Sequence, residues 1–422
     1  MARAVTAAGF DCVVLEARDR VGGRTWSETQ PDGTIVDLGG QWIGPTQHRM
    51  MELVQELGID VFPTYDIGET QRSLGGKDAA FGKIGDMFAD LDAMAALLPL
   101  EAPWDAPQAA GWDTMTFHSW LLGRFGDPDA MALARLVTSA LFTAEPEEIS
   151  LLHALIYTRS AGSIALLTEV AGGAQELRFA KGAQEVSRRL AEIVGRDKVR
   201  LGTPVNRITR SDAGVIVEAG DLRVEARRAI VAVPIAIADR IHHVPPLPAH
   251  RVQLNQRAAP GATIKIHCIY ERPFWREKGL NGRLMFDEGP VTVSFDNSPR
   301  DGGTGVLVGF VEADFARAFG KLSAAARREA VLDCFTRFFG EEAANPSGYV
   351  EANWSEEEWT RGCYGANFPP GAWTRYGWAL REPVDQLHWA GAETSPIWMN
   401  YMEGAVRSGE RAAAEVVAAL TG

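Results

Sequence analysis

Apolar residues recur along the chain with two spacings, which together predict a mixture of strands and helices. Short apolar runs typical of buried strands occupy residues 12–15, 35–38, 205–209, 215–218 and 229–233. Apolar positions three to four residues apart predict amphipathic helices over residues 46–57, 127–142, 183–194, 323–339 and 402–420. Mixed strands and helices in this order indicate an α/β nucleotide-binding fold with insertions.

The stretch from Thr263 to Tyr270 alternates cleanly and predicts a strand with two different faces. Lys265 lies on one face with Thr263, and Ile264 and Ile266 lie on the other. One face therefore belongs to the core, and the face that carries Lys265 meets either solvent or a cavity. A lysine in such a place is most often simply solvated.

Composition narrows the class of protein. With 422 residues and 46% hydrophobic residues, the chain is long enough for two or three structural domains. No apolar run approaches the roughly 20 residues that cross a bilayer, and the N-terminus has no signal-peptide pattern, so we expect a cytoplasmic protein and no membrane partner. The net charge of −13 disfavours nucleic acid as a partner.

Cysteine and histidine usage gives no sign of a metal centre. The four cysteines are widely spaced without a C-x-x-C pair, and the eight histidines form no ligand set. We therefore expect neither a disulfide framework nor a bound metal. Any special cysteine has to be argued from its own surroundings.

Residues 15–25 (LEARDRVGGRT) carry the first chemical signal. Glu16 ends an apolar strand, where an acidic side chain accepts the hydroxyls of a ribose, and Gly22 and Gly23 let the backbone approach a pyrophosphate beside Arg24. This arrangement suits an adenine dinucleotide, although an ordinary exit from a strand explains it equally well. In dinucleotide-binding units a G-x-G-x-x-G loop precedes the acidic residue by roughly 20 positions. Because 15 residues precede Glu16, we expect the first strand and its phosphate loop to be absent from this chain.

The C-terminal quarter carries a more specific signal. Residues 361–365 (RGCYG) are followed by 368–371 (FPPG), 374–377 (TRYG) and 401–404 (YMEG). Together with residues 15–25 and 37–47 (DLGGQWIGPTQ), these strings resemble the flavin monoamine oxidase family, and the resemblance covers essentially the whole chain. It implies a glutathione-reductase-like, Rossmann-type FAD domain with an inserted α+β substrate domain.

The resemblance assigns residues to the cofactor FAD. Those implied to bind it are Glu16, Arg18, Gly23, Arg24, Thr25, Gly39, Gly40, Gln41, Trp42, Val205, Trp354, Cys363, Gly391, Glu393, Thr394 and Met402. In monoamine oxidases the cysteine of the RGCYG string is bonded to the flavin 8α carbon, which implies an 8α-S-cysteinyl link at Cys363. A lone cysteine beside glycine is usually inert. This chain also departs from the animal enzymes at Gly365, and many bacterial relatives hold FAD without a covalent bond.

The resemblance also assigns four residues to the reaction. Tyr364 and Tyr401 correspond to two aromatic walls that guide an amine to the flavin, whereas taken singly each could be a core tyrosine. Lys265 corresponds to the lysine that holds a water at flavin N5, where a positive charge assists the reaction of reduced flavin with oxygen. Gln175 corresponds to a glutamine that lines the substrate cavity, although a turn residue is the simpler reading.

The implied function is oxidation of a primary or secondary amine to aldehyde, ammonia and hydrogen peroxide, with the small-molecule amine and oxygen as partners. By the family pattern the FAD domain comprises residues 1–61, 180–254 and 357–422, and the substrate domain comprises residues 62–179 and 255–356. A homodimer is compatible with the sequence, which does not fix the oligomeric state. The alternatives are a polyamine oxidase, an L-amino acid oxidase, or a truncated non-catalytic remnant with impaired FAD binding. We favour none of these. We expect instead that the full gene product begins further upstream and is an active oxidase, and that the present form of the chain binds FAD poorly.

Overall fold

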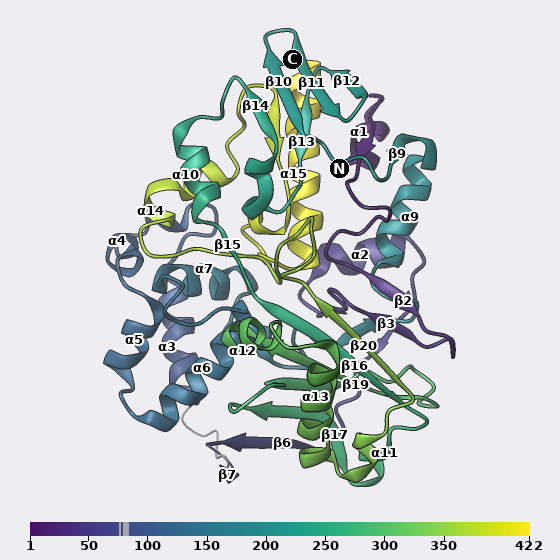
Figure 1. Ribbon diagram of the computed structural model, residues 1–422. Helices are drawn as coiled ribbons and strands as arrows, with labels where there is room; N and C mark the ends of the chain where they lie inside the picture. The colour runs from purple at the N-terminus through teal and green to yellow at the C-terminus, as the bar shows by residue number, and fades with distance from the viewer. Residues whose placement is uncertain (76, 79–83) are drawn as a thin grey trace.

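The lower half of the molecule in Figure 1 is organised around one seven-stranded sheet. The computed structural model describes residues 1–75, 77–78 and 84–422. In spatial order the strands are β20 (Gly348–Asn353), β16 (Thr263–Tyr270), β19 (Gly305–Glu312), β18 (Val293–Asp296), β17 (Leu280–Phe286), β6 (Glu69–Leu74) and β7 (Lys77–Asp78). All pairs are antiparallel except β17 with β6.

Alternation of side chains decides which face of this sheet is covered. Ile264 and Ile266 of β16 are fully buried in a cluster that also contains Val331 and Phe335 of the helix α13 (Ala324–Phe339). Two shorter helices, α11 (Phe274–Glu277) and α12 (Ala313–Phe319), complete this part. The Ser323 hydroxyl caps α13 by accepting the Ala326 N–H, so this predicted helix is confirmed with its start marked by the cap.

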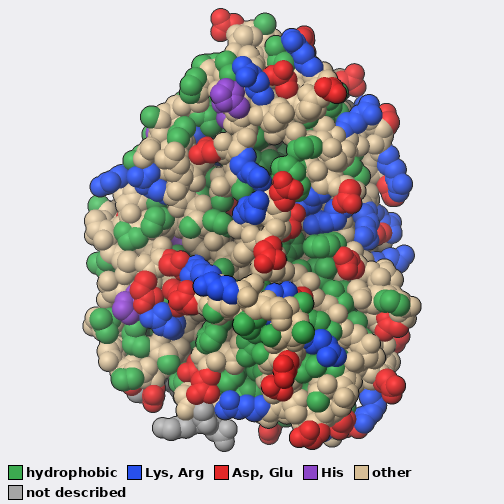
Figure 2. Space-filling model, viewed as in Figure 1, with side chains coloured by type: hydrophobic (Ala, Val, Ile, Leu, Met, Phe, Trp, Pro, Cys, Tyr) green, Lys and Arg blue, Asp and Glu red, His purple; other side chains and the backbone are tan. Residues whose placement is uncertain are grey.

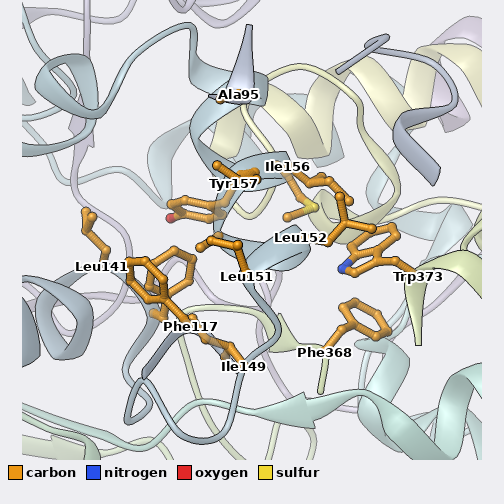
Figure 3. Packing of buried hydrophobic residues seen from close by; sticks show 14 of the residues in the cluster. Ala95, Phe117, Leu141, Ile149, Leu151, Leu152, Ile156, Tyr157, Phe368 and Trp373 are labelled. Atoms are coloured by element: carbon orange, nitrogen blue, oxygen red, sulfur yellow. The ribbon is translucent and has the colours of Figure 1, made fainter. Parts of the chain in front are cut away.

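A helical layer flanks the sheet on the left of Figure 1. Its helices are α3 (Ile84–Ala95), α4 (Ala109–Asp113), α5 (Phe117–Arg124), α6 (Pro128–Phe142), α7 (Leu151–Ala161) and α8 (Ile164–Thr168). Helix α7 is the centre of the layer, because ten of its eleven residues are buried. Figure 3 shows Leu152 and Tyr157 of α7 among side chains from other segments, including Phe117 and Trp373. This single core joins residues that are far apart in the sequence.

The upper half contains short parallel strands and the long helix α15 (Met402–Thr421). Strand β1 (Val14–Leu15) pairs in parallel with β9 (Val199–Arg200), and β13 (Ala229–Val231) pairs in parallel with β22 (Leu387–Trp389). Among the described residues, β1 and β13 are each hydrogen-bonded to that one neighbouring strand. The predicted strands at residues 12–15 and 229–233 are confirmed in shortened form.

The remaining strands of the described chain form one four-stranded sheet and three smaller sheets. A four-stranded sheet contains β12 (Leu222–Ala226), β11 (Gly214–Ala219), β10 (Arg207–Ser211) and β14 (His242–Val244). Small sheets are formed by β4 (Trp42–Ile43), β8 (Leu177–Phe179) and β5 (Val61–Pro63), by β2 (Ser27–Thr29) with β3 (Ile35–Asp37), and by β15 (Ala259–Pro260) with β21 (Ala366–Asn367). The remaining helices are α1 (Ala2–Ala7), α2 (His48–Glu56), α9 (Glu185–Val194), α10 (Ala249–Arg257) and α14 (Trp373–Tyr376).

Two predicted boundaries moved. The strand expected from residue 205 begins at Arg207, which leaves Val205 in the loop before β10. Helix α2 begins at His48, and its last turn is followed by Gly58 with φ +60°, the left-handed conformation expected there. Helix α2 is held to α15 by the buried carboxylate of Glu403, which accepts the N–H groups of Arg49 and Met50 at 3.1 and 2.6 Å.

The lengths of the helices and the distribution of surface charge bear on which partners the protein could bind. No helix among the described residues is long and apolar enough to cross a membrane. On the face shown in Figure 2, acidic and basic side chains are interspersed.

Candidate active site

A cavity of about 1370 Å³ runs between the two halves of the fold. At its upper end it is lined by Val14 and Leu15 of β1 and by residues 229–231 of β13. Its lower end is lined by side chains of β16, β17, β18 and β19. All of the predicted site residues line this cavity except Glu393 and Thr394. Segments from the beginning, middle and end of the chain therefore meet around one space.

Glu16 and Arg18 form the rim at the end of β1. The Glu16 carboxylate accepts the Arg18 backbone N–H at 2.9 Å, and Glu16 lines the cavity together with Val205. The Arg18 guanidinium pairs with Glu357, with its Nε 3.1 Å from Oε1, and its Nη1 also lies 3.6 Å from the Glu16 carboxylate. Arg18 therefore links Glu16 to Glu357.

A glycine pair lets two backbone segments touch below this rim. A Cβ at Gly39 would lie 2.0 Å from the Arg24 carbonyl oxygen and 3.1 Å from the Trp354 ring, so only glycine fits. Gly40 donates its N–H to the same Arg24 carbonyl at 3.0 Å. The close contact gives the cavity a floor made of backbone, with the Trp354 indole donating to the Leu38 carbonyl at 2.8 Å.

Arg24 explains why Glu393 lies outside the cavity lining. The two side chains form a two-point ion pair, with Nη1 to Oε1 at 2.7 Å and Nη2 to Oε2 at 2.9 Å. Burial lowers the pKa of Arg24, but pairing with Glu393 outweighs this and raises the pKa overall. Glu393 thus holds Arg24, and Arg24, together with Thr25 and Gly23, contributes to the cavity wall.

Lys265 points from β16 into the cavity, which confirms the cavity alternative for this face of the strand. Its Nζ donates to the Gly39 carbonyl at 2.7 Å and to the Gln41 side-chain oxygen. The Trp42 and Phe310 rings each lie 5.5 Å from the same nitrogen. Burial lowers the pKa of Lys265 to about 7, against the opposing effect of Asp37. The amine is thus poised between its charged and neutral forms near neutral pH.

Cys363 is a buried free thiol in the cavity wall. It is 4% exposed, and burial raises its pKa to about 12. Thr143, the left-handed residue after α6, donates its hydroxyl to the Cys363 carbonyl at 2.5 Å. The backbone of Cys363 is therefore held by Thr143, and its thiol is protonated at neutral pH.

Tyr364 and Tyr401 reach the same cavity from different elements. Tyr364 precedes β21, and its ring packs edge-on against Phe310, with centroids 6.3 Å apart. Tyr401 is the residue immediately before α15 and packs against Trp398 at 4.8 Å and Tyr157 at 6.1 Å. Burial raises the pKa of Tyr401 to about 12, so its phenol is neutral. Met402, the first residue of α15, also lines the cavity and places the helix N-terminus there.

Gln175 lies in the turn between α8 and β8. Its amide nitrogen donates to the Leu167 carbonyl at 3.1 Å, and its side-chain oxygen has no hydrogen-bond partner within the described part of the chain. A buried acceptor without a partner is costly in a folded protein. Gln175 thus offers a free acceptor to whatever enters the cavity.

Sequence reasoning missed two residues that hold this site. Glu312 ends β19, lines the cavity and accepts the Tyr364 hydroxyl at 2.7 Å. Thr143 holds the backbone of Cys363 and Tyr364. A carboxylate at the end of an apolar strand (GVLVGFVE) was a visible signal for Glu312. Nothing in the sequence marks Thr143, because its neighbours in space are 220 positions away.

Several polar groups of the cavity wall lack a hydrogen-bond partner within the described residues, which favours a polar ligand. Four further side-chain atoms that line the cavity have no hydrogen-bond partner within the described residues: Trp42 Nε1, Thr263 Oγ1, Asn400 Oδ1 and Arg228 Nε. Apolar walls between such groups are typical of cofactor sites. These groups could contact a bound dinucleotide, and Glu16, Lys265 and Cys363 line the same cavity.

Comparison with known proteins gives the family. Residues 1–417 match the family of flavin containing amine oxidoreductases. Amine oxidase B of Sus scrofa is 37% identical over 432 residues, which cover 98% of this chain and 82% of that protein. A putrescine oxidase structure superposes with a TM-score of 0.94 at 36% identity and covers 99% of this chain and 96% of that chain. Cyclohexylamine oxidase from Brevibacterium oxydans gives 0.96 at 33% identity, covering 100% and 96%.

The chain belongs to the flavin-containing amine oxidoreductase family, as the sequence motifs predicted. It is a flavin-dependent amine oxidase with FAD as its cofactor.

Proposed function

We propose that this enzyme oxidises the α carbon of a small primary or secondary amine whose reactive end lies between Tyr364 and Tyr401. For a primary amine the overall reaction is R–CH2–NH2 + O2 + H2O giving R–CHO + NH3 + H2O2. FAD, when bound, supplies the two-electron acceptor for the amine and passes the electrons to oxygen. The observation that carries the proposal is that both tyrosines, Lys265 and Cys363 line one cavity.

The side chains of the cavity favour a neutral amine. Its substrate end is lined by apolar and aromatic residues such as Leu136, Leu141, Tyr157 and Phe295. Such surroundings disfavour an ammonium ion, so the amine loses its proton there without a strong protein base. Two aromatic faces then fix the direction of its C–H bond. Gln175 can accept an N–H of the substrate with its free side-chain oxygen.

Lys265 serves the oxygen half of the reaction in this proposal. Its ammonium form is held in the cavity wall by the Gly39 carbonyl and the Gln41 side chain. A fixed positive charge stabilises negative charge that develops on oxygen. The proposal therefore separates the roles: the tyrosines act on the amine, and Lys265 acts on oxygen.

We also propose that FAD is bonded to Cys363 through its 8α carbon. The thiol lines the cavity near Arg24 and Tyr364 and does not form a disulfide. Forming this thioether would remove the S–H proton of Cys363 and one hydrogen of the 8α methyl group, and the two electrons released would pass through FAD to oxygen, the oxidant of the proposed reaction. Burial raises the pKa of the Cys363 thiol, which makes it a weak nucleophile while it stays protonated.

A peroxide assay tests the proposed function. An arylalkyl monoamine, an aliphatic diamine and an L-amino acid are compared as substrates, using the enzyme as isolated and its Tyr401→Leu variant. We expect turnover of an amine and a loss of about tenfold or more in kcat/KM for Tyr401→Leu. Tyr376→Leu is the control, because Tyr376 packs on Arg257 away from the cavity. A Tyr401→Leu variant as active as the wild-type enzyme would contradict the aromatic-wall proposal. If only the L-amino acid were turned over, the proposed substrate would change from an amine to an amino acid.

A further inference from the structure

Glu312 stands out among the residues of the cavity. It is the acidic residue among the described side chains that line the cavity below the glycine pair, and it is 1% exposed. It pairs with no lysine or arginine of the described chain, and burial raises its pKa to about 7. Burying an unpaired carboxyl group is costly. A group kept at such a cost calls for a specific explanation.

Strand periodicity brings Glu312 to the cavity. Residues of β19 alternate between two faces, with Leu307 and Val311 packed in the core that contains α13. Phe310 and Glu312 therefore share the other face, and both line the cavity. Glu312 follows Phe310 by two positions and stands beside the same ring, Tyr364, that Phe310 contacts edge-on.

Both carboxyl oxygens of Glu312 are engaged by hydroxyl groups. Tyr364 donates its phenol to Oε1 at 2.7 Å, and Thr292 donates its hydroxyl to Oε2 at 3.0 Å. Thr292 is in turn anchored through its backbone N–H to the Phe310 carbonyl at 2.9 Å. The chain of contacts runs from the backbone of β19 through Thr292 and Glu312 to the tip of the Tyr364 ring.

The opposite end of Tyr364 is fixed as well. Its backbone N–H donates to Thr143 Oγ1 at 3.2 Å, and its carbonyl accepts from Arg24 at 2.7 Å. Without Glu312 the ring would keep its backbone anchors and its packing against Phe310, but its phenol end would lose the hydrogen bond that fixes it. A wall that must hold a substrate to a fraction of an ångström needs both ends fixed.

We propose that Glu312 is a positioning residue that fixes the ring of Tyr364 by accepting its phenol hydrogen, with Thr292 holding Glu312. The proposal rests on the proposed function of Tyr364 as a wall of the amine site. It holds whether Glu312 is charged or neutral, because a neutral carboxyl group also accepts the phenol and can donate to Thr292.

The first test separates kcat from KM. Glu312→Leu and Tyr364→Phe each remove the contact, and each is expected to lower kcat about tenfold per bound flavin, with KM changed less than about threefold. Glu312→Gln keeps an acceptor oxygen of the same reach and should restore kcat to within about threefold. The double variant Glu312→Leu with Tyr364→Phe should be no slower than either single variant. A loss of stability or of flavin content alone would not produce this pattern.

A second Glu–Tyr pair on the same sheet provides the matched control. Glu351 accepts the Tyr349 phenol at 2.8 Å on the edge strand β20, outside the cavity. Tyr349→Phe should leave kcat and KM unchanged.

Four results would overturn the inference. The first two are full activity of the Glu312→Leu variant and a Glu312→Gln variant as slow as Glu312→Leu. The third is an additive loss of kcat in the double variant. The fourth is a loss of activity in Glu312→Leu that is confined to diamines, which would make Glu312 a substrate-binding group. The Tyr364→Leu variant distinguishes failure of the aromatic wall from failure of the Glu312 contact. Its full activity would remove the aromatic wall and the inference together, whereas a slow Tyr364→Leu beside a fully active Glu312→Leu would remove the inference alone.

Discussion

Arg24 forms a two-point ion pair with Glu393, donating hydrogen bonds of 2.7 and 2.9 Å, although the two residues are 369 positions apart in the sequence. The same arginine donates to the Tyr364 carbonyl, so one side chain joins the N-terminal glycine segment, the segment with Cys363 and the loop before α15. Paired charges of this kind are costly to break, because the remaining partner is left buried and uncompensated. The junction of these three segments is therefore expected to be sensitive to single substitutions.

Glu393→Ala should lower the free energy of unfolding by about 3 kcal/mol, because Arg24 would keep its buried charge without a partner. Urea unfolding followed by tryptophan fluorescence measures the change. The control is Glu192→Ala, whose ion pair with Arg196 has side chains 53% and 81% exposed. That variant should change the free energy by less than about 0.5 kcal/mol. Equal effects of the two substitutions would contradict the structural role of the pair.

Cys363→Ala should release FAD from the protein on acid precipitation, if the wild-type cofactor is bonded to the thiol. The wild-type pellet is then yellow, and the variant leaves its colour in the supernatant. Cys334→Ala is the control, because Cys334 is also buried with its pKa raised to about 12 by burial but belongs to α13 and lies in the core, away from the cavity. A colourless pellet from the wild-type protein would refute the covalent bond and leave the oxidase function untouched.

Lys265→Met should slow the reaction of the amine-reduced enzyme with oxygen by about 100-fold, through loss of the positive charge. In the wild-type enzyme the charge is present below the lysine pKa of about 7 and is lost above it. The rate of reoxidation should therefore fall as the pH rises through 7, and this dependence should vanish in Lys265→Met. Rapid mixing of reduced enzyme with oxygen measures both. Lys278→Met, at a partly exposed lysine bound to the Phe339 carbonyl, should keep the wild-type rate and pH profile.

His153 should make the protein sensitive to acid. It is buried in α7, where Nδ1 accepts the Trp373 indole N–H at 3.2 Å and Nε2 contacts the Asn367 side-chain oxygen at 3.3 Å. Burial lowers its pKa from 6.5 to about 4, so the unfolded chain takes up a proton first. About 3 kcal/mol of stability, present above pH 6.5, should disappear as the pH falls toward 4.

Urea unfolding across that pH range checks this expectation with a non-titrating variant. In His153→Gln the stability should be lower at neutral pH and should fall less steeply on acidification than in the wild-type protein. His48→Gln, at an exposed position, should retain the steep wild-type dependence. Parallel curves for wild-type and His153→Gln would show that acid sensitivity arises elsewhere.

The sequence by itself determined the periodic elements and the local motifs. Helices such as α13 could be predicted because an apolar stripe and a serine cap are encoded within a few adjacent residues. Strand β16 was predicted with both ends correct, since alternation is a local property. Motif strings around Glu16, Cys363 and Tyr401 likewise predicted the family, because each string is contiguous in the chain.

Only the tertiary structure decided which of these residues act together. Whether Lys265 faced solvent or a cavity depended on the packing of β16 against segments more than 200 positions away. Glu393, which the motif resemblance assigns to the cofactor, pairs with Arg24 and does not itself line the cavity, and only the folded chain brings these two residues together. The partnership of Glu312 with Tyr364 joins residues 52 positions apart and leaves no periodic trace in the sequence. Local patterns follow from backbone geometry and burial, whereas contacts of this kind exist only once the chain has folded.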